Sequence, residues 1–498
     1  MSESADGSYE ALLDRYQRYS YTQSANGILQ WDQYVTMPEG GRNLRSNQMS
    51  TLTTLAQEQI TDPEVCELLD DLDDAVLTDA ESAVVREIRR EYDQATCVPT
   101  EIREALSDLT SEAHPAWNKA KDEDDFSVFA PHLERIVEKK REYANAVNPE
   151  TEPYETLVTE FIPQLDFETV ERTILAVKDG LVPLLDRIHQ SETDLNTDAI
   201  HGDYEEDAQL AAARDLLDVF GFDWERGRLD TFDMPGTFGF PSDARVCTWT
   251  EKSLYQTLYT TAHEGGHGLY AQGLPVEKSG TPLGKDRGTL VNESQAAFWE
   301  NRVFAHRAFW EAFLPILKER FLNIDATPQE AYESVNYVRE RNPVWVEADE
   351  LTGQIHILLR FEIERDLING EIAVNEIPTA WNNKTEEYFG VRPQTLAEGC
   401  LQDIHWSQGN IGYFPTYTLG NALAAQVTAA LERDLGGVGE LIREGDIQRI
   451  LEWNREAIHQ HGQRYTTPEL IQRVTGEMLS ADDFIEYTTD KYTDLYDL

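Results

Sequence analysis

Two histidines and a glutamate in the middle of the chain have the spacing of a metal site. The segment from Thr260 to Tyr270 reads TTAHEGGHGLY and contains the pattern H-E-x-x-H. Residues four apart on an α-helix lie on one face about one turn apart, so His263 and His267 can each offer a ring nitrogen to one Zn²⁺. Glu264 lies beside them, where its carboxylate can take the proton of a water on the metal. The spacing therefore predicts metal-assisted hydrolysis.

Glu293, 26 residues after His267, is the expected third ligand. A hydrolytic zinc site has three protein ligands and one open position. Asn292 and Gln295 resemble a capping box, which would place Glu293 on the first turn of a second helix that continues through Phe298–Phe304. The expected metal is Zn²⁺, one ion per chain.

A chance match is the alternative interpretation, because a chain with 11 histidines can contain an H-E-x-x-H without any metal. Gly265 and Gly266 argue against it. A glycine in a helix interior costs about 1 kcal/mol relative to alanine. Two in succession therefore indicate a backbone that lies close to another segment or to a substrate.

The composition limits what the protein can bind. Asp and Glu total 92 against 42 Lys and Arg, a formal net charge of -50, and only 11 of the 42 are Lys. Such a field repels polyanions, so nucleic acid and anionic membranes are poor partners. An acidic, lysine-poor surface is typical of proteins from a high-salt cytoplasm, where salt screens the self-repulsion. Disorder is excluded by 40% hydrophobic residues, with 10 Trp, 21 Tyr and 18 Phe.

The cysteines and the N-terminus indicate a reducing compartment such as the cytoplasm. Cys66, Cys97, Cys247 and Cys400 are widely spaced and form no C-x-x-C pair, which favours a reducing environment over a disulfide framework. The first residues have neither the basic nor the apolar region of a signal peptide, and no apolar run reaches 18 residues. We expect a soluble, cytoplasmic protein with no membrane partner.

Most of the sequence has helical spacing. Apolar residues from Phe129 to Val147 recur every three or four positions until Asn148 and Pro149. Another helix is expected from Asp203 to Phe220, with Gly221 as its stop. No repeat, low-complexity tract or long linker is visible, so we predict one continuous helical body.

Residues 243–250 break this pattern. They alternate after a stretch rich in Gly, Pro and aromatics, which predicts a short strand directly before the H-E-x-x-H helix, with an ordinary loop as the alternative. An edge strand beside a metal site could hold an extended peptide by main-chain hydrogen bonds.

A polar cluster lies in the segments 399–406 and 409–417. Its imidazole and phenol groups, from His405, Tyr413 and Tyr417, could stabilise the oxyanion that forms when water adds to a peptide carbonyl. The alternative is a core histidine packed among aromatics. Arg360 and Arg365, on an expected helix before the cluster, fit ion pairs better than ligand contacts.

Together these motifs resemble the carboxypeptidase Taq family of thermostable zinc carboxypeptidases. The resemblance runs from Trp31 to Asn421, and its blocks are 263–267, 293–295, 348–352 and 399–406. It implies an all-α fold like that of neurolysin and angiotensin-converting enzyme, with a deep active-site groove. It also implies a single catalytic domain, residues 1–498, with an N-terminal helical arm, about residues 1–120, over the groove.

The resemblance further implies removal of C-terminal amino acids from peptides, by a homodimer with Zn²⁺ or sometimes Co²⁺. It makes His263, His267 and Glu293 the ligands and Glu264 the base. The other site residues that it carries over are Asp243 and Arg245 on a substrate strand, Gln402 and Asp403 for substrate binding, His405 and Tyr417 for catalysis, and Tyr413 for substrate binding or in place of Tyr417.

Five positions near this site depart from the family pattern. Asn292 and Met234 stand where the family has histidine, Cys247 where it has threonine and Gly353 where it has tyrosine. Trp345 replaces an arginine that is expected to grip the terminal carboxylate of the substrate. An indole cannot supply that bidentate contact.

These departures keep two alternatives open. One is a zinc peptidase of altered specificity that accepts blocked or internal bonds, unless Arg245, Arg360 or another cation replaces the lost arginine. The other is a non-catalytic peptide-binding scaffold. The intact ligands and base favour an enzyme over the scaffold.

Overall fold

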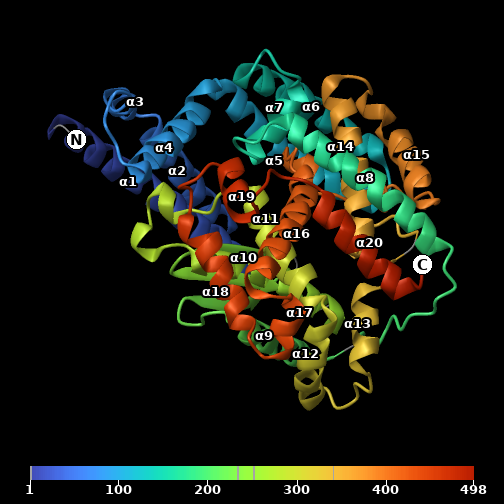
Figure 1. Cartoon of the computed structure of the whole chain (residues 1–498). Coiled ribbons are helices and arrows are strands. Elements are labelled where there is room, and N and C mark those ends of the chain that lie inside the picture. Colours follow the sequence, from blue (N-terminus) through green and yellow to red (C-terminus); the bar gives the residue numbers. More distant parts are fainter. Residues whose placement is uncertain (1–2, 203, 233–234, 251–252, 340) are drawn as a thin grey trace.

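The computed structural model describes residues 3–202, 204–232, 235–250, 253–339 and 341–498. Met234 and Asp203, where a motif residue and a helix start were predicted, lie outside the described residues. Helices dominate the described chain, with a small three-stranded sheet (Figure 1). The predicted all-α fold with a minor β element next to the H-E-x-x-H helix is therefore confirmed.

The elements follow one another along the whole chain. The α-helices are α1 (Glu3–Val35), α2 (Arg42–Ile60), α3 (Pro63–Asp71), α4 (Asp79–Cys97), α5 (Thr100–Glu123), α6 (Phe126–Val147), α7 (Pro153–Phe161), α8 (Phe167–His189), α9 (Glu206–Phe220), α10 (Leu254–Gly273), α11 (Thr289–Ala297), α12 (Arg307–Arg320), α13 (Pro328–Asn336), α14 (Glu350–Asn369), α15 (Ile377–Phe389), α16 (Pro415–Leu435), α17 (Val438–Arg443), α18 (Ile447–Ala457), α19 (Thr467–Thr475) and α20 (Asp482–Tyr496). The strands are β1 (Gly227–Thr231), β2 (Gly236–Phe240) and β3 (Asp243–Thr248).

Helix ends lie where local sequence signals predict them. α6 ends at Val147, directly before Asn148, and α9 ends at Phe220 with Gly221 in the left-handed region at φ 89°. α14 begins with a capping box in which the Asp349 side chain accepts from the backbone N–H of Thr352. This cap fixes the segment that leads from Trp345 into α14.

The N-terminal helices form an arm with its own hydrophobic cluster. Its buried members include Leu12 of α1, Ile60 of α2 and Ile88 of α4, whereas residues from α5 onward share one large core. Figure 1 shows this arm, in blue, to one side of the body. Buried Glu87 of α4 pairs with Arg287, which lies just before α11, through contacts of 2.8 and 2.9 Å. That ion pair ties the arm to the helix that carries Glu293.

The sheet has the strand order β1-β3-β2, with β1 parallel and β2 antiparallel to β3. The predicted strand is β3, and it contacts α10 as expected. The idea that this strand is an edge strand is wrong, because β3 is the central strand and its hydrogen bonds are used on both sides. A peptide could add to the sheet only at β1 or β2.

Glycines set the contacts of α11 with its two neighbours. A Cβ at Gly266 of α10 would lie 2.7 Å from the Cα of Ala296, and a Cβ at Gly420 of α16 would lie 2.7 Å from the Cβ of Glu293. Any larger residue would push the helices apart. The close approach predicted for the glycines of α10 is confirmed at Gly266, and the neighbouring segment is α11.

Candidate metal centre

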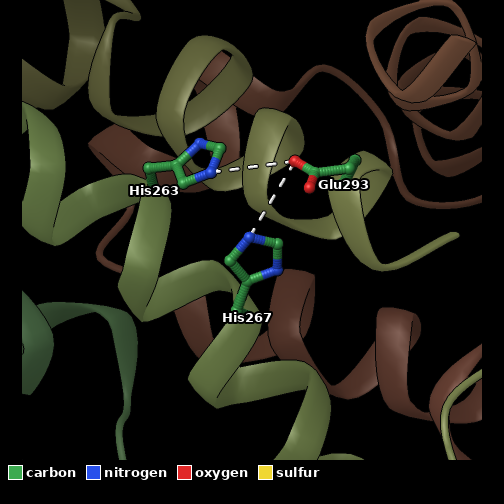
Figure 2. A group of neighbouring side chains, drawn as sticks. All are labelled: His263, His267 and Glu293. Atoms are coloured by element: carbon green, nitrogen blue, oxygen red, sulfur yellow. Dashed lines mark ion pairs between the residues drawn. The ribbon is translucent and has the colours of Figure 1, made fainter. Parts of the chain in front are cut away.

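His263 and His267 extend from one side of α10 toward Glu293 of α11 (Figure 2). Their Nε2 atoms lie 3.8 and 4.0 Å from Oε2 of Glu293, and one ligand atom from each of the three residues lies within 4.8 Å of the other two. A point about 2.2–2.5 Å from all three atoms therefore exists, close to the Zn–N and Zn–O distances of about 2.0–2.2 Å. Two imidazoles and a carboxylate fit a hydrolytic metal with one open position.

The predicted capping box of α11 is wrong. The helix begins at Thr289, after Gly288, whose φ of 102° favours glycine, and no side chain caps it. Glu293 therefore lies one turn inside the helix, and Asn292 is a helical residue. The predicted continuation is present, because residues Phe298–Phe304 extend α11 as the π-helical segment η4.

Each candidate ligand has a hydrogen-bond partner behind it. Nδ1 of His263 lies 2.5 Å from Oε2 of Glu300, and Nδ1 of His267 lies 2.7 Å from Oδ1 of Asn292. Tyr413 donates its hydroxyl to Oε1 of Glu293 at 3.0 Å. An acceptor at Nδ1 fixes the tautomer that leaves Nε2 free for a metal. Asn292 thus provides the acceptor for His267.

Negative charge surrounds His263. Burial lowers the pKa of its ring, but the hydrogen bond and charge of Glu300, together with the charges of Glu264 and Glu293, outweigh burial and raise the pKa to about 10. Carboxylates gathered in this way around two imidazoles favour a bound cation.

Glu264 is held by the sheet. Its carboxylate is nearly buried, and the hydroxyl of Thr237 lies 2.8 Å from both its Oε2 and its backbone oxygen. Thr237 lies on β2, so the sheet fixes the rotamer of the predicted base. A positioned carboxylate next to a metal site is what general-base catalysis requires.

His263 and Glu264 open onto a cavity of about 910 Å³. Helices α5, α10, α14 and α16 contribute side chains to its wall, as does the segment 402–410. The wall includes Trp117, Trp249 and Trp345, and the acidic residues Glu300, Asp349, Glu350 and Asp403. Aromatic surface and hydrogen-bonding groups in one cavity suit a peptide.

Five of the predicted site residues from the polar cluster line this cavity: Gln402, Asp403, His405, Tyr413 and Tyr417. Burial and the charge of Glu293 raise the pKa of Tyr417 well above its usual value, so its phenol keeps the proton and can donate it in a hydrogen bond. Burial lowers the pKa of His405, so its ring is neutral at pH 7.

Gln402 and Asp403 make contacts that support the cavity wall. Oε1 of Gln402 accepts from the backbone N–H of Trp345 at 2.8 Å. Oδ2 of Asp403 accepts from Nε of Arg360 at 2.7 Å, and the Arg360 guanidinium lies 5.1 Å from the centre of the Trp345 ring. Trp345 therefore rests on a buried cation. A substrate contact by Gln402 or Asp403 stays a prediction.

The other two predicted substrate residues lie elsewhere. Arg245 donates from Nε and Nη2 to the two carboxylate oxygens of Asp243, both on β3. Neither residue is among the described residues that line the cavity. Their predicted role in substrate binding is untested, and the geometry does not add to it.

Several residues of the site were not predicted from the sequence. Glu300 could have been found, because it follows Glu293 by seven residues and so returns to the same helix face. Tyr259, which donates to Glu300, precedes His263 by four residues and shares its face. Thr237 and Arg339 carry no local signal, since only tertiary packing brings them to the cavity.

The body is helical, and two histidines of its H-E-x-x-H helix lie close to a glutamate of a second helix. A further glutamate, next to the first histidine in sequence, is not a ligand. This arrangement defines a metal-dependent hydrolase. The chain belongs to the carboxypeptidase Taq (M32) metallopeptidase family, whose sequence pattern matches residues 11–492. It is therefore a metallocarboxypeptidase, a hydrolase that acts on peptides and depends on a divalent metal. The family predicted from the sequence motifs is confirmed.

Relatives support this assignment over the whole length. Thermostable carboxypeptidase 1 of Thermus thermophilus is 36% identical over 99% of both chains, and that of Pyrococcus furiosus is 34% identical over 97% of both. The crystal structure of the M32 carboxypeptidase from Deinococcus radiodurans matches with a TM-score of 0.95 at 32% identity, covering 99% of this chain and all of the other. Among the described residues, none of the helices combines the length and apolar character that crossing a membrane requires.

Proposed function

We propose that His263, His267 and Glu293 bind one Zn²⁺ and that Glu264 is the general base of the carboxypeptidase reaction. The observation that supports this assignment is the convergence of three ligand atoms within 4.8 Å of one another, next to a carboxylate held in place by Thr237. A bound Zn²⁺ would lower the pKa of water to about 7 and polarise the peptide carbonyl.

The side chains around the site have separate tasks. Glu264 accepts a proton from the attacking water and delivers it to the leaving amine as the C–N bond breaks. Tyr417, which stays protonated, donates a hydrogen bond to the oxyanion, with neutral His405 as a second donor. Water supplies the oxygen of the new carboxylate, and the released product carries the free amine.

Metal removal tests this proposal. Dialysis of the full chain against a chelator should abolish hydrolysis of an N-blocked peptide, and one equivalent of Zn²⁺ should restore it; Co²⁺ serves as the comparison metal. We expect the wild type to bind one Zn²⁺ tightly per chain and His267→Ala to bind no Zn²⁺. Full activity of the metal-free chain would contradict the proposal.

A zinc peptidase of altered specificity is the second candidate, and Trp345 is the observation that favours it. Its indole lies in the cavity wall at the position where the resemblance predicts an arginine. Equal cleavage of a peptide with a free C-terminus and of its C-terminal amide would support this candidate. A strong preference for the free acid would support a strict carboxypeptidase.

Three broader proposals rest on composition and family resemblance. We infer a single catalytic domain over residues 1–498, in which an N-terminal helical region of about residues 1–120 covers the cavity; the support is α5, which shares the main core and contributes His114, Trp117 and Asn118 to the wall. We also infer a homodimer and a salt-rich cytoplasm as its setting, the latter from the net charge of -50. Light scattering and the dependence of activity on salt test these proposals.

A further inference from the structure

The cavity is acidic, and that creates a problem for a carboxypeptidase. Its described lining includes five carboxylates, from Glu264, Glu300, Asp349, Glu350 and Asp403. Glu350 and Asp403 are paired with buried cations, whereas no lysine or arginine of the described residues forms an ion pair with the other three. A substrate with a free C-terminus brings another negative charge into the same space. A partly buried carboxylate needs a cationic partner with good geometry, because desolvation otherwise disfavours it. The cavity must therefore offer a cation other than the metal.

Arg339 is the only arginine or lysine among the described residues that line the cavity. The two arginines considered from the sequence are already committed to other contacts. Arg245 binds both carboxylate oxygens of Asp243. Arg360 is fully buried, with Nε on Asp403 and Nη1 on the backbone oxygen of His356.

Arg339 is held in place but keeps donor capacity. Nε donates to the Tyr337 hydroxyl at 2.9 Å, and Nη1 donates to the backbone oxygen of Glu347 at 2.5 Å. The guanidinium lies 5.2 Å from the ring centres of both Tyr255 and Tyr337. Within the described part of the chain, no carboxylate forms an ion pair with it and Nη2 has no hydrogen-bond partner. A guanidinium held against aromatic rings, with the two N–H groups of Nη2 still available, is preorganised to bind a carboxylate.

The position of Arg339 also suits a terminal carboxylate. Tyr255, which its guanidinium covers, lies on α10 two turns before His263, about 12 Å along the helix axis. An extended peptide rises about 3.4 Å per residue. After allowance for the guanidinium–carboxylate contact, this span leaves room for one or two residues beyond the cleaved bond.

The geometry points to Arg339 as the residue that binds the terminal carboxylate of the peptide substrate in this chain, in place of the arginine lost at Trp345. The inference rests on the proposed function, because it needs a peptide whose reacting carbonyl lies at the metal centre. It assigns a specificity-determining contact to a residue outside the blocks that carry the family resemblance.

The test compares one N-blocked tetrapeptide with its C-terminal amide, using the full chain loaded with zinc. The wild type should prefer the acid in kcat/KM. Arg339→Met should lower kcat/KM for the acid by about 10- to 100-fold, the range for a charge-assisted contact, and leave the amide unchanged. Arg339→Lys should recover part of the loss. Arg341→Met, which changes an exposed arginine two residues away, is the matched control and should match the wild type.

Two results would overturn the inference: equal losses for the acid and the amide, which indicate a structural role, or an undiminished preference for the acid in Arg339→Met. A wild type that does not discriminate would overturn it as well. If the wild type hydrolyses neither peptide, the proposed function fails separately. Calorimetric binding of the same two peptides then decides the inference, since Arg339→Met should weaken binding of the acid alone.

Discussion

Replacement of Glu300 tests how the protein holds its metal ligands. Oε2 of Glu300 lies 2.5 Å from Nδ1 of His263, and its Oε1 accepts from the Tyr259 hydroxyl. The residue is 6% exposed, so solvent screens the contact little. Loss of such a partner lowers metal affinity by about 10- to 100-fold, which corresponds to about 1.4–2.7 kcal/mol. Glu300→Gln keeps an acceptor but loses the charge and should fall near the lower limit, and Glu300→Ala should fall near the upper limit.

Competition with a chromophoric chelator gives the Zn²⁺ dissociation constant of each variant. Tyr259→Phe is the control, because it removes the other contact of Glu300 and leaves the bond to His263 intact; its affinity should change by less than about threefold. If Glu300→Ala and the wild type bind Zn²⁺ with the same affinity within error, Glu300 does not support His263 as a metal ligand.

Three further predictions concern stability and catalysis. Burial opposes ionisation of Glu87, but its ion pairs with Arg287 and Arg90 outweigh burial and lower its pKa to about 2. The ionised carboxylate therefore stabilises the fold by about 3 kcal/mol above pH 4.5, and this contribution is lost as the pH falls from 4.5 toward 2. Glu87→Gln should lack this contribution of about 3 kcal/mol at pH 7. Its acid-unfolding curve should also depend less on pH between 4.5 and 2. Gly266→Ala should lower stability by about 1–3 kcal/mol in thermal unfolding because its Cβ meets the backbone of α11, whereas at Gly353, where the nearest atom is 3.9 Å away, alanine should be tolerated. Tyr417→Phe should lower kcat by about 100-fold with little change in KM, and an unchanged kcat would remove Tyr417 from the reaction.

The sequence predicted the helical character of the body and the common helix face of His263 and His267, because both depend on local periodicity. The end of α6 at Val147 and the stop of α9 at Gly221 follow from signals of a few residues. The two histidines share a helix face by spacing alone. Glu293 was expected because a hydrolytic site needs a third ligand and this glutamate follows the two histidines at the start of a second helical segment, and the structure brings it to the histidines.

The errors arose where the decisive contact is not local. The pattern of Asn292 and Gln295 fits a capping box in isolation, but the backbone of Gly288 starts the helix earlier. Strands β1 and β2 lack a clear alternation of apolar and polar residues, so only their pairing with β3 reveals them. This pairing also makes β3 a central strand. The positions of Thr237 and Arg339 depend on packing between distant segments, which no short pattern records.

The central claim is that three side chains hold one metal and that Glu264 acts on the water beside it. The most direct measurement is the metal content and peptidase activity of Glu264→Gln, prepared in parallel with the wild type and His267→Ala. We expect Glu264→Gln to retain one metal ion per chain with activity reduced at least 100-fold, and His267→Ala to lose the metal. Substantial activity in Glu264→Gln, or stoichiometric metal with activity in His267→Ala, would contradict the account.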